Sequence, residues 1–145
     1  MAIRRIDHVG LVVEDLKTVR DFFVHFGMEV AADAVIEGDW VDRIIGLKDA
    51  KCAMVMMTTP DGEATLEIIQ FERPVSEEGI RQTQLNAPGL RHVAFVVDDV
   101  EATAARLQQK GATLLGEIVN YKGVYKLCCL RGPEGILVEL AEELS

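Results

Sequence analysis

The sequence has few cysteines, few aromatic residues and no long apolar run. Aromatic residues make up 6% of the 145 positions, and the three cysteines are Cys52, Cys128 and Cys129. No C-x-x-C spacing occurs, which excludes a zinc ribbon or a dithiol redox pair, so we expect reduced and buried thiols. No apolar run reaches the roughly 18 residues of a membrane span, and the first residues lack a signal-peptide apolar segment. We therefore expect a soluble, cytoplasmic protein without a membrane partner.

Several enzyme motifs and an excess of positive charge are also missing. The only serines are Ser76 and Ser145, and neither lies in a G-x-S-x-G elbow. Neither G-x-x-x-x-G-K-[ST] nor G-x-G-x-x-G occurs, which excludes the recognised glycine-rich phosphate cradles. Lys and Arg number 15 against 24 Asp and Glu, a formal net charge of −9. Nucleic acid is therefore not an expected partner.

The chain repeats itself. Residues 6–16, IDHVGLVVEDL, resemble residues 90–100, LRHVAFVVDDV, and the 84 positions that separate His8 from His92 also separate Gly27 from Gly111. Two copies of one unit are the economical explanation. With 49% hydrophobic residues, the chain has enough apolar content for the two copies to form one ordinary folded domain.

Each copy is predicted to be a βαβββ unit of the α+β class. It opens with an alternating β-rich run, and an acidic pair follows that can cap a helix. Apolar residues at three-and-four spacing then predict the buried face of a helix: Leu16, Val19, Phe22, Phe23 and Phe26 in the first copy, and Val100, Ala104 and Leu107 in the second. Three further β-like stretches follow in each copy: 28–37, 52–58 and 64–71, then 112–119, 124–130 and 136–141.

The duplication predicts two tandem modules within one compact domain. The first module covers residues 1–71 and the second covers residues 90–145. Between them, residues 72–89 are rich in Pro, Gly and Ser, as connectors are. We expect this connector to hold one helical turn around Ile80.

Each module contributes one histidine in its first strand and one glutamate in its last: His8 with Glu67, and His92 with Glu139. A lone strand histidine is more often a core or edge residue, and a strand glutamate usually faces water. Both glutamates, however, stand between apolar neighbours, where an unpaired carboxylate is costly and a bound cation removes the penalty. Repetition of these ligand types under the duplication predicts a pseudo-two-fold metal cluster.

The chemistry of these four residues limits the choice of metal ion and of reaction. Two imidazoles and two carboxylates favour one divalent ion: Zn, Ni, Co, Mn or Fe. With a water or a ligating glutamate as general base, such a site suits proton transfer next to a carbonyl. His25 is predicted to lie on the polar side of its helix and is left out of the set.

For the residues that could contact a substrate, the sequence allows more than one interpretation. Trp40 and Arg43 are candidates for a short lid over the site, and Arg131 for a contact with an anionic group; the competing interpretation is a surface helical turn and surface arginines. Met54, Met56 and Met57 are either a soft wall for an acyl chain or strand-core residues, and the core is favoured.

The sequence resembles the vicinal-oxygen-chelate superfamily, which includes glyoxalase I, methylmalonyl-CoA epimerase, extradiol dioxygenases, and the fosfomycin- and bleomycin-resistance proteins. The resemblance covers nearly the whole chain and is carried by 6–16, by Phe22-Phe23 before Gly27-Met28, by 90–100 and by 132–140. It implies a U-shaped mixed sheet around a metal bound by His8, Glu67, His92 and Glu139. In that family the two modules of one cup come from one chain or from two chains, and a homodimer is expected.

The resemblance is less specific for the reaction. The His-Glu-His-Glu set is similar to that of glyoxalase I (lactoylglutathione lyase), where a ligating glutamate moves a proton; Glu139 or Glu67 would take that role. No glutathione-binding signature is present, and the connector looks more like that of methylmalonyl-CoA epimerases. A fourth ligand argues against an iron dioxygenase. A non-catalytic binder, similar to the bleomycin-resistance proteins, is the remaining class. We expect a metal-dependent lyase or isomerase with a small-molecule substrate.

Overall fold

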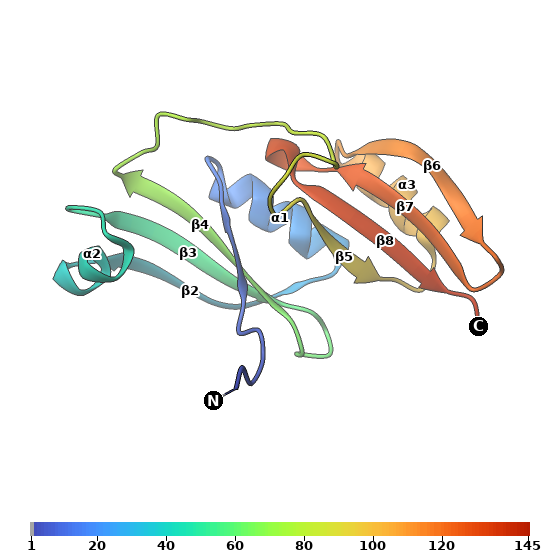
Figure 1. Ribbon diagram of the computed structural model, residues 1–145, viewed down its shortest axis with the longest axis horizontal. Helices are drawn as coiled ribbons and strands as arrows, with labels where there is room; N and C mark the ends of the chain where they lie inside the picture. Colours follow the sequence, from blue (N-terminus) through green and yellow to red (C-terminus); the bar gives the residue numbers. More distant parts are fainter. Residues whose placement is uncertain (1) are drawn as a thin grey trace. The chain divides into compact units, whose positions relative to one another are not determined.

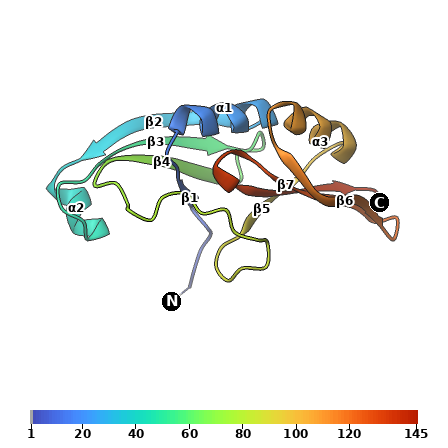
Figure 2. The same cartoon turned by 90° about the horizontal axis from the view of Figure 1, so that it is seen from above.

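The computed structural model describes residues 2–145, which form two compact units. One unit ends at Ile80 and the other begins at Arg81, inside the predicted connector. Each unit consists of a four-stranded mixed sheet with an α-helix along one of its faces (Figures 1 and 2). The predicted α+β class and the two tandem βαβββ modules are confirmed.

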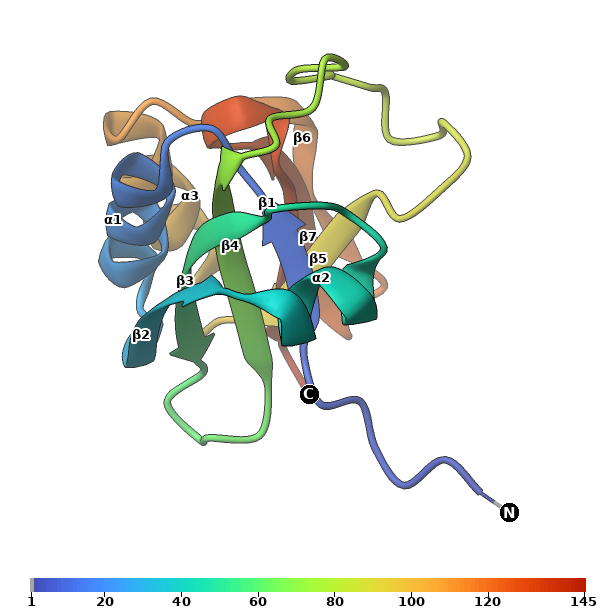
Figure 3. The ribbon, with the colours of Figure 1, turned by 90° about the vertical axis from the view of Figure 1, so that its left-hand side faces the viewer.

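The first unit holds four strands and two helices: β1 (Val9–Val12), α1 (Leu16–Phe26), β2 (Glu29–Glu37), α2 (Asp39–Ile45), β3 (Lys51–Thr58) and β4 (Thr65–Arg73). The strand order is β1-β4-β3-β2, with β1 parallel to β4 and the other pairs antiparallel. The short helix α2 follows directly on β2, at one end of the sheet (Figure 3).

The second unit repeats this plan without a counterpart of α2 among its described residues. Its elements are β5 (His92–Val96), α3 (Val100–Gln109), β6 (Thr113–Tyr121), β7 (Tyr125–Arg131), a 3₁₀ turn (Pro133–Gly135) and β8 (Leu137–Glu143). The strand order is β5-β8-β7-β6, and again the first strand runs parallel to the last. Of the helices within residues 2–145, none is long and apolar enough to cross a membrane.

The acidic pairs cap both helices as predicted. The Asp15 carboxylate accepts a hydrogen bond from the backbone N–H of Thr18 at 3.0 Å, and Asp99 accepts one from Ala102 at 2.9 Å. Each bond satisfies an N–H group that has no partner inside the helix. The hydrogen bonds from Thr18 lower the pKa of Asp15, so the carboxylate stays ionised next to the positive end of the helix.

The last strand of each unit also binds the start of the helix. The backbone N–H of Leu16 donates to Gln70 Oε1 on β4 at 2.9 Å, and that of Val100 donates to Glu142 Oε1 on β8 at 2.9 Å. Both contacts join the same two elements at equivalent positions. The duplication therefore reaches the level of single hydrogen bonds and fixes each helix against its sheet.

The predicted helix faces form the core. Val19, Phe22, Phe23 and Phe26 are buried on α1, and Val100, Ala104 and Leu107 are buried on α3, whereas Leu16 is only half-buried. His25 departs from its prediction. It lies at the edge of the buried face, beside Phe26, so it is half-buried, and its Nε2 is buried without a hydrogen-bond partner among the described residues.

The strands complete the core with alternate residues. Met57 and Ile68 of the first sheet, and Leu130 and Leu140 of the second, have no exposed surface. The expectation of core methionines is therefore right for Met57. Met54 and Met56 lie on the other face of the first sheet and are half-buried.

The expected helical turn around Ile80 is wrong. The connector contains isolated turns: the backbone N–H of Glu78 donates to the Ser76 hydroxyl, and that of Ala87 donates to the carbonyl of Gln84. Gly79 adopts a φ of +67°, outside the right-handed helical region. These local bonds replace the repeated pattern that a helix requires.

Replacing Phe23 by alanine tests the burial of α1. We expect Phe23→Ala to lower the free energy of unfolding by about 3–5 kcal/mol, because it leaves a cavity in the core. Its neighbour Val24 is 47% exposed, so Val24→Ala should change the free energy by less than about 0.5 kcal/mol. Urea denaturation followed by circular dichroism measures both values. Equal, small losses for the two variants would contradict this packing of α1.

Candidate metal centre

The histidine and glutamate of each unit lie on the sheet face opposite its helix, here called the open face. In the first sheet the open face includes Gly10, Val12, Met54, Met56, Glu67 and Ile69. In the second sheet it includes Ala94, Val96, Leu127, Cys129, Glu139 and Ala141. Successive strand residues point to opposite faces, so Leu66 and Ile68 are buried toward α1 while Glu67 lies on the open face.

The first pair is His8 with Glu67. His8 Nε2 lies 3.2 Å from Glu67 Oε2, and the exposed fractions of the two side chains are 37% and 18%. His8 Nδ1 lies 2.8 Å from Asp7 Oδ2, and Arg5 Nη1 lies 3.1 Å from the other oxygen of that carboxylate. The hydrogen bond to Asp7 raises the pKa of His8, the negative charge of Glu67 adds to the effect, and burial opposes it.

The two ring nitrogens of His8 have different partners: Nδ1 faces Asp7 and Nε2 faces Glu67. A metal-binding histidine typically has its other ring nitrogen bound to a carboxylate or a carbonyl, which fixes the orientation of the ring. Asp7 supplies that carboxylate, and the hydrogen bond to His8 is the main reason why the pKa of Asp7 is lowered. The Nε2 atom is thereby directed toward Glu67.

The second pair is His92 with Glu139. His92 Nε2 lies 3.4 Å from Glu139 Oε2, and the exposed fractions are 47% and 30%. The residue before His92 is Arg91, whereas the residue before His8 is Asp7. The two pairs therefore share their donor atoms but differ in the charge beside the histidine.

The structure brings each histidine to the glutamate of its own unit. Within residues 2–145, no three His, Cys, Asp or Glu side chains form one metal-binding group. The joining of all four predicted ligands at one ion stays a prediction.

The nearby thiols are poor competitors as ligands. Cys129 stands opposite Glu139 in the sheet, and all three cysteines are free, as expected, with Cys129 only half-buried. Burial raises the pKa of the Cys128 thiol to about 11, and burial together with the charge of Glu139 raises the pKa of Cys129. Because the thiolate is the form that binds metals, these shifts favour the nitrogen and oxygen donors of the two pairs.

Trp40 and Arg43 lie on α2. The exposed fraction of Trp40 is 56%, and Arg43 is 79% exposed beside Asp39, with 3.7 Å between Nη1 and Oδ2. Neither side chain is held against the open face by a hydrogen bond or ion pair to another element of the described chain. Their role as a lid that contacts substrate stays a prediction.

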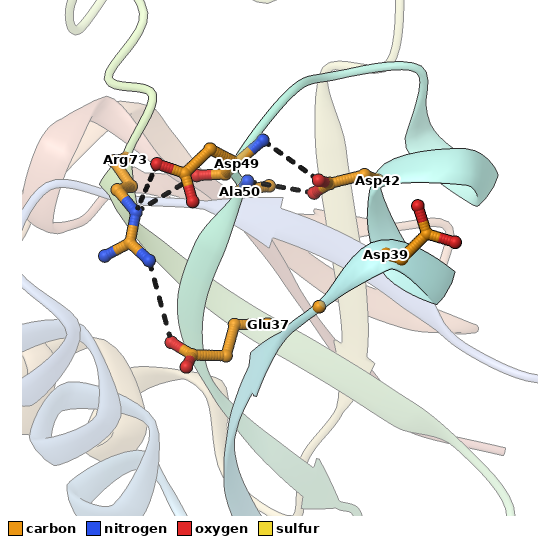
Figure 4. A pocket seen from close by; sticks show the side chains of 7 residues that line it. Glu37, Asp39, Asp42, Asp49, Ala50 and Arg73 are labelled. Atoms are coloured by element: carbon orange, nitrogen blue, oxygen red, sulfur yellow. Dashed lines mark hydrogen bonds and ion pairs between the residues drawn. The ribbon is translucent and has the colours of Figure 1, made fainter.

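A shallow pocket of about 280 Å³ lies beside α2 (Figure 4). Its charges bind the protein itself: both Asp42 oxygens accept backbone hydrogen bonds, from Asp49 and Ala50 at 2.9 Å each. Arg73 Nε lies 3.1 Å from the carbonyl oxygen of Asp49 and 3.2 Å from its carboxylate. These hydrogen bonds and the ion pair hold the loop after α2 in place, so the charged groups of the pocket already have partners within the protein.

Arg131 lies on the open face of β7, two residue pairs beyond Cys129 and Glu139. Its guanidinium donates to two carbonyl oxygens, those of Gly135 at 3.3 Å and Thr83 at 2.8 Å. Its predicted contact with an anionic substrate stays a prediction. The sequence reasoning missed Asp7, Arg91 and Thr83, although the contrast between Asp7-His8 and Arg91-His92 was visible in the repeated motif.

Known proteins are similar to this chain in sequence and fold. The model of the Glyoxalase/Bleomycin resistance protein/Dioxygenase superfamily matches residues 5–140. A glyoxalase family protein from Bacillus cereus is 39% identical, with a TM-score of 0.96 and with 100% of this chain and 97% of that chain covered.

Two more distant structures share the fold alone. One is the fosfomycin resistance protein FosX from Listeria monocytogenes, complexed with Mn(II) and dihydroxypropylphosphonic acid; it is 15% identical, with a TM-score of 0.63 and 96% and 90% of the two chains covered. The other is TnmS3, an antibiotic binding protein from Streptomyces sp. CB03234; it is 20% identical, with a TM-score of 0.64 and coverage of 99% and 98%. The duplicated βαβββ fold and the family match over residues 5–140 together establish that this chain belongs to the glyoxalase/bleomycin resistance protein/dioxygenase superfamily.

Proposed function

We propose that the protein is a metal-dependent lyase or isomerase that moves a proton next to a substrate carbonyl, in the manner of glyoxalase I. The observation that carries the proposal is the repeated pair of donors, with His8 and Glu67 at 3.2 Å and His92 and Glu139 at 3.4 Å. Each pair stands on an otherwise largely apolar open face. A repeated contact of this kind has no evident value for packing, because it leaves two carboxylates half-buried among apolar side chains.

The donor chemistry fits a divalent ion. His8, Glu67, His92 and Glu139 would hold it, and Asp7 supports His8 from behind at 2.8 Å. Imidazole and carboxylate donors suit Zn, Ni, Co, Mn or Fe. An ion held by these residues would supply a positive charge that polarises a substrate carbonyl and so makes the neighbouring proton easier to remove.

The glutamates supply the base. A carboxylate takes the proton from the carbon next to the carbonyl. In a glyoxalase I-like reaction it returns the proton to the neighbouring carbon, and in an epimerase-like reaction the second glutamate, in its protonated form, gives a proton to the other face of the same carbon. We assign this role first to Glu139, whose side chain is 30% exposed, and second to Glu67, which is 18% exposed.

A non-catalytic role is the second candidate. The half-buried Met54 and Met56 give the first open face a soft, adaptable apolar surface, and TnmS3, which has the same fold, is an antibiotic binding protein. Such a binder would use the open faces without needing the two donor pairs. Metal retention and proton transfer separate the two candidates.

Metal retention is the first test. The full chain is incubated separately with Zn, Ni, Co, Mn and Fe, desalted, and measured by elemental mass spectrometry. We expect His8→Ala and His92→Ala each to lower retention of the preferred ion by at least about ten-fold. Glu63→Gln, an exposed turn residue close to Glu67 in the chain, should retain the ion fully. Absence of every ion from the wild-type chain would overturn the metalloenzyme proposal.

Proton transfer is the second test, on metal-loaded protein in D₂O followed by proton NMR. The hemithioacetal of methylglyoxal and glutathione tests the glyoxalase I-like reaction, and deuterium incorporation into methylmalonyl-CoA tests the epimerase-like one. We expect Glu139→Gln to slow the active reaction by about a hundred-fold or more, while Glu63→Gln keeps the full rate. A metal-loaded protein that acts on neither substrate would contradict this proposal and favour the binding protein.

A further inference from the structure

The two units differ in charge next to their donor pairs. Asp7 precedes His8, but Arg91 precedes His92. A second difference follows from the registers: Thr58 stands opposite Thr65 in the first sheet, and Arg131 stands opposite Leu137 in the second, two residue pairs beyond the glutamate in each case. Two guanidinium groups therefore occupy positions where the first unit has a carboxylate and a hydroxyl.

Both arginines meet at one residue of the connector. Arg91 Nη1 donates to Thr83 Oγ1 at 2.6 Å, and Arg131 Nη2 donates to the Thr83 carbonyl oxygen at 2.8 Å. Their other bonds go to the carbonyl oxygens of Pro88 and Gly135. All four of these acceptor groups are neutral.

Arg91 also has an N–H group that donates no hydrogen bond to the described residues. Its Nε is buried and has no hydrogen-bond partner among the described residues. Its guanidinium lies so close to Gly89 that a Cβ there would be 2.5 Å from Nη2. A buried N–H of a charged group without an acceptor is costly, so the protein's own acceptors satisfy this guanidinium incompletely.

The arginines stand beside the second donor pair. Arg91 is adjacent to His92 in the chain, and His92, Leu137 and Arg131 lie side by side on β5, β8 and β7. The two arginines and the second donor pair therefore come from the same end of the second sheet. In a chain with a net charge of −9, attraction of an anion requires such a local concentration of cations.

We propose that Arg91 and Arg131 form an oxyanion-binding site for a carboxylate or phosphate group. The hydroxyl and carbonyl oxygens of Thr83 now occupy the positions that the oxygens of the bound anion would take. Guanidinium groups bind an oxyanion through paired, charge-assisted hydrogen bonds, which are stronger than bonds to neutral acceptors. The assignment of this anion to the substrate rests on the proposed function. The substrate class is then an anionic carbonyl compound.

Replacement of Thr83 should strengthen anion binding instead of weakening it. Thr83→Val keeps the shape of the side chain and removes the hydroxyl that competes for Arg91. We expect it to tighten binding of the preferred anion about three-fold or more, whereas Arg91→Gln and Arg131→Gln weaken it about ten-fold, the effect of losing one charged hydrogen bond. Arg81→Gln removes the same charge from an exposed position in the connector and should leave the affinity unchanged.

The measurement is an NMR titration of the full chain with inorganic phosphate and, separately, with acetate, at constant ionic strength so that general screening is the same. Tighter binding of phosphate indicates a phosphate-bearing substrate, and tighter binding of acetate indicates a carboxylate. Circular dichroism confirms that each variant is folded. The proposal is overturned if neither anion binds the wild-type chain, if Thr83→Val weakens binding, or if Arg81→Gln weakens it as much as Arg131→Gln.

The two proposals fail separately. Anion binding that depends on Arg91 and Arg131 in a protein that retains no metal would leave the oxyanion site standing and remove the metalloenzyme. A protein that retains metal and transfers protons, but binds no anion at these arginines, would keep the enzyme and remove the oxyanion site.

Discussion

The alternation of side chains along the last strand of each unit is the constraint on which the rest of the structure depends. Leu66 and Ile68 are buried against the helix, and this burial supplies the apolar contacts that hold the unit together. A shift of one residue in register would turn Glu67 toward the helix and both apolar residues toward the open face. The core therefore fixes the carboxylate on the open face, opposite the helix and within 3.2 Å of His8.

Much of this could be read from the sequence because the duplication supplied two independent views of one unit. The helix faces, with Phe23 and Leu107 at their centres, followed from spacing alone, and so did the caps at Asp15 and Asp99. The approach of each histidine to its glutamate followed from their repetition. Local periodicity is a strong signal where one face of an element is buried.

The rest depended on contacts that the sequence pattern does not encode. The connector around Ile80 has no periodic burial, so its conformation is set by single side-chain and backbone bonds such as that between Ser76 and Glu78. The half-buried position of His25 depends on the tertiary contacts of the last turn of α1, which helical periodicity does not specify. The partners of Arg131 required the path of the connector, which brings Thr83 to within 2.8 Å of its guanidinium.

The departures from duplication carry more chemical information than the duplication itself. Identical halves would place the same charge beside both histidines. Asp7 instead holds His8 in a fixed orientation, whereas the guanidinium of Arg91 is directed into the connector. Gly135, at a φ of +78°, lets Gln82 approach so closely that a Cβ there would lie 2.9 Å from its Cγ. The connector is thus packed onto the turn before β8, and it brings Thr83 to the two cations that distinguish the second unit from the first.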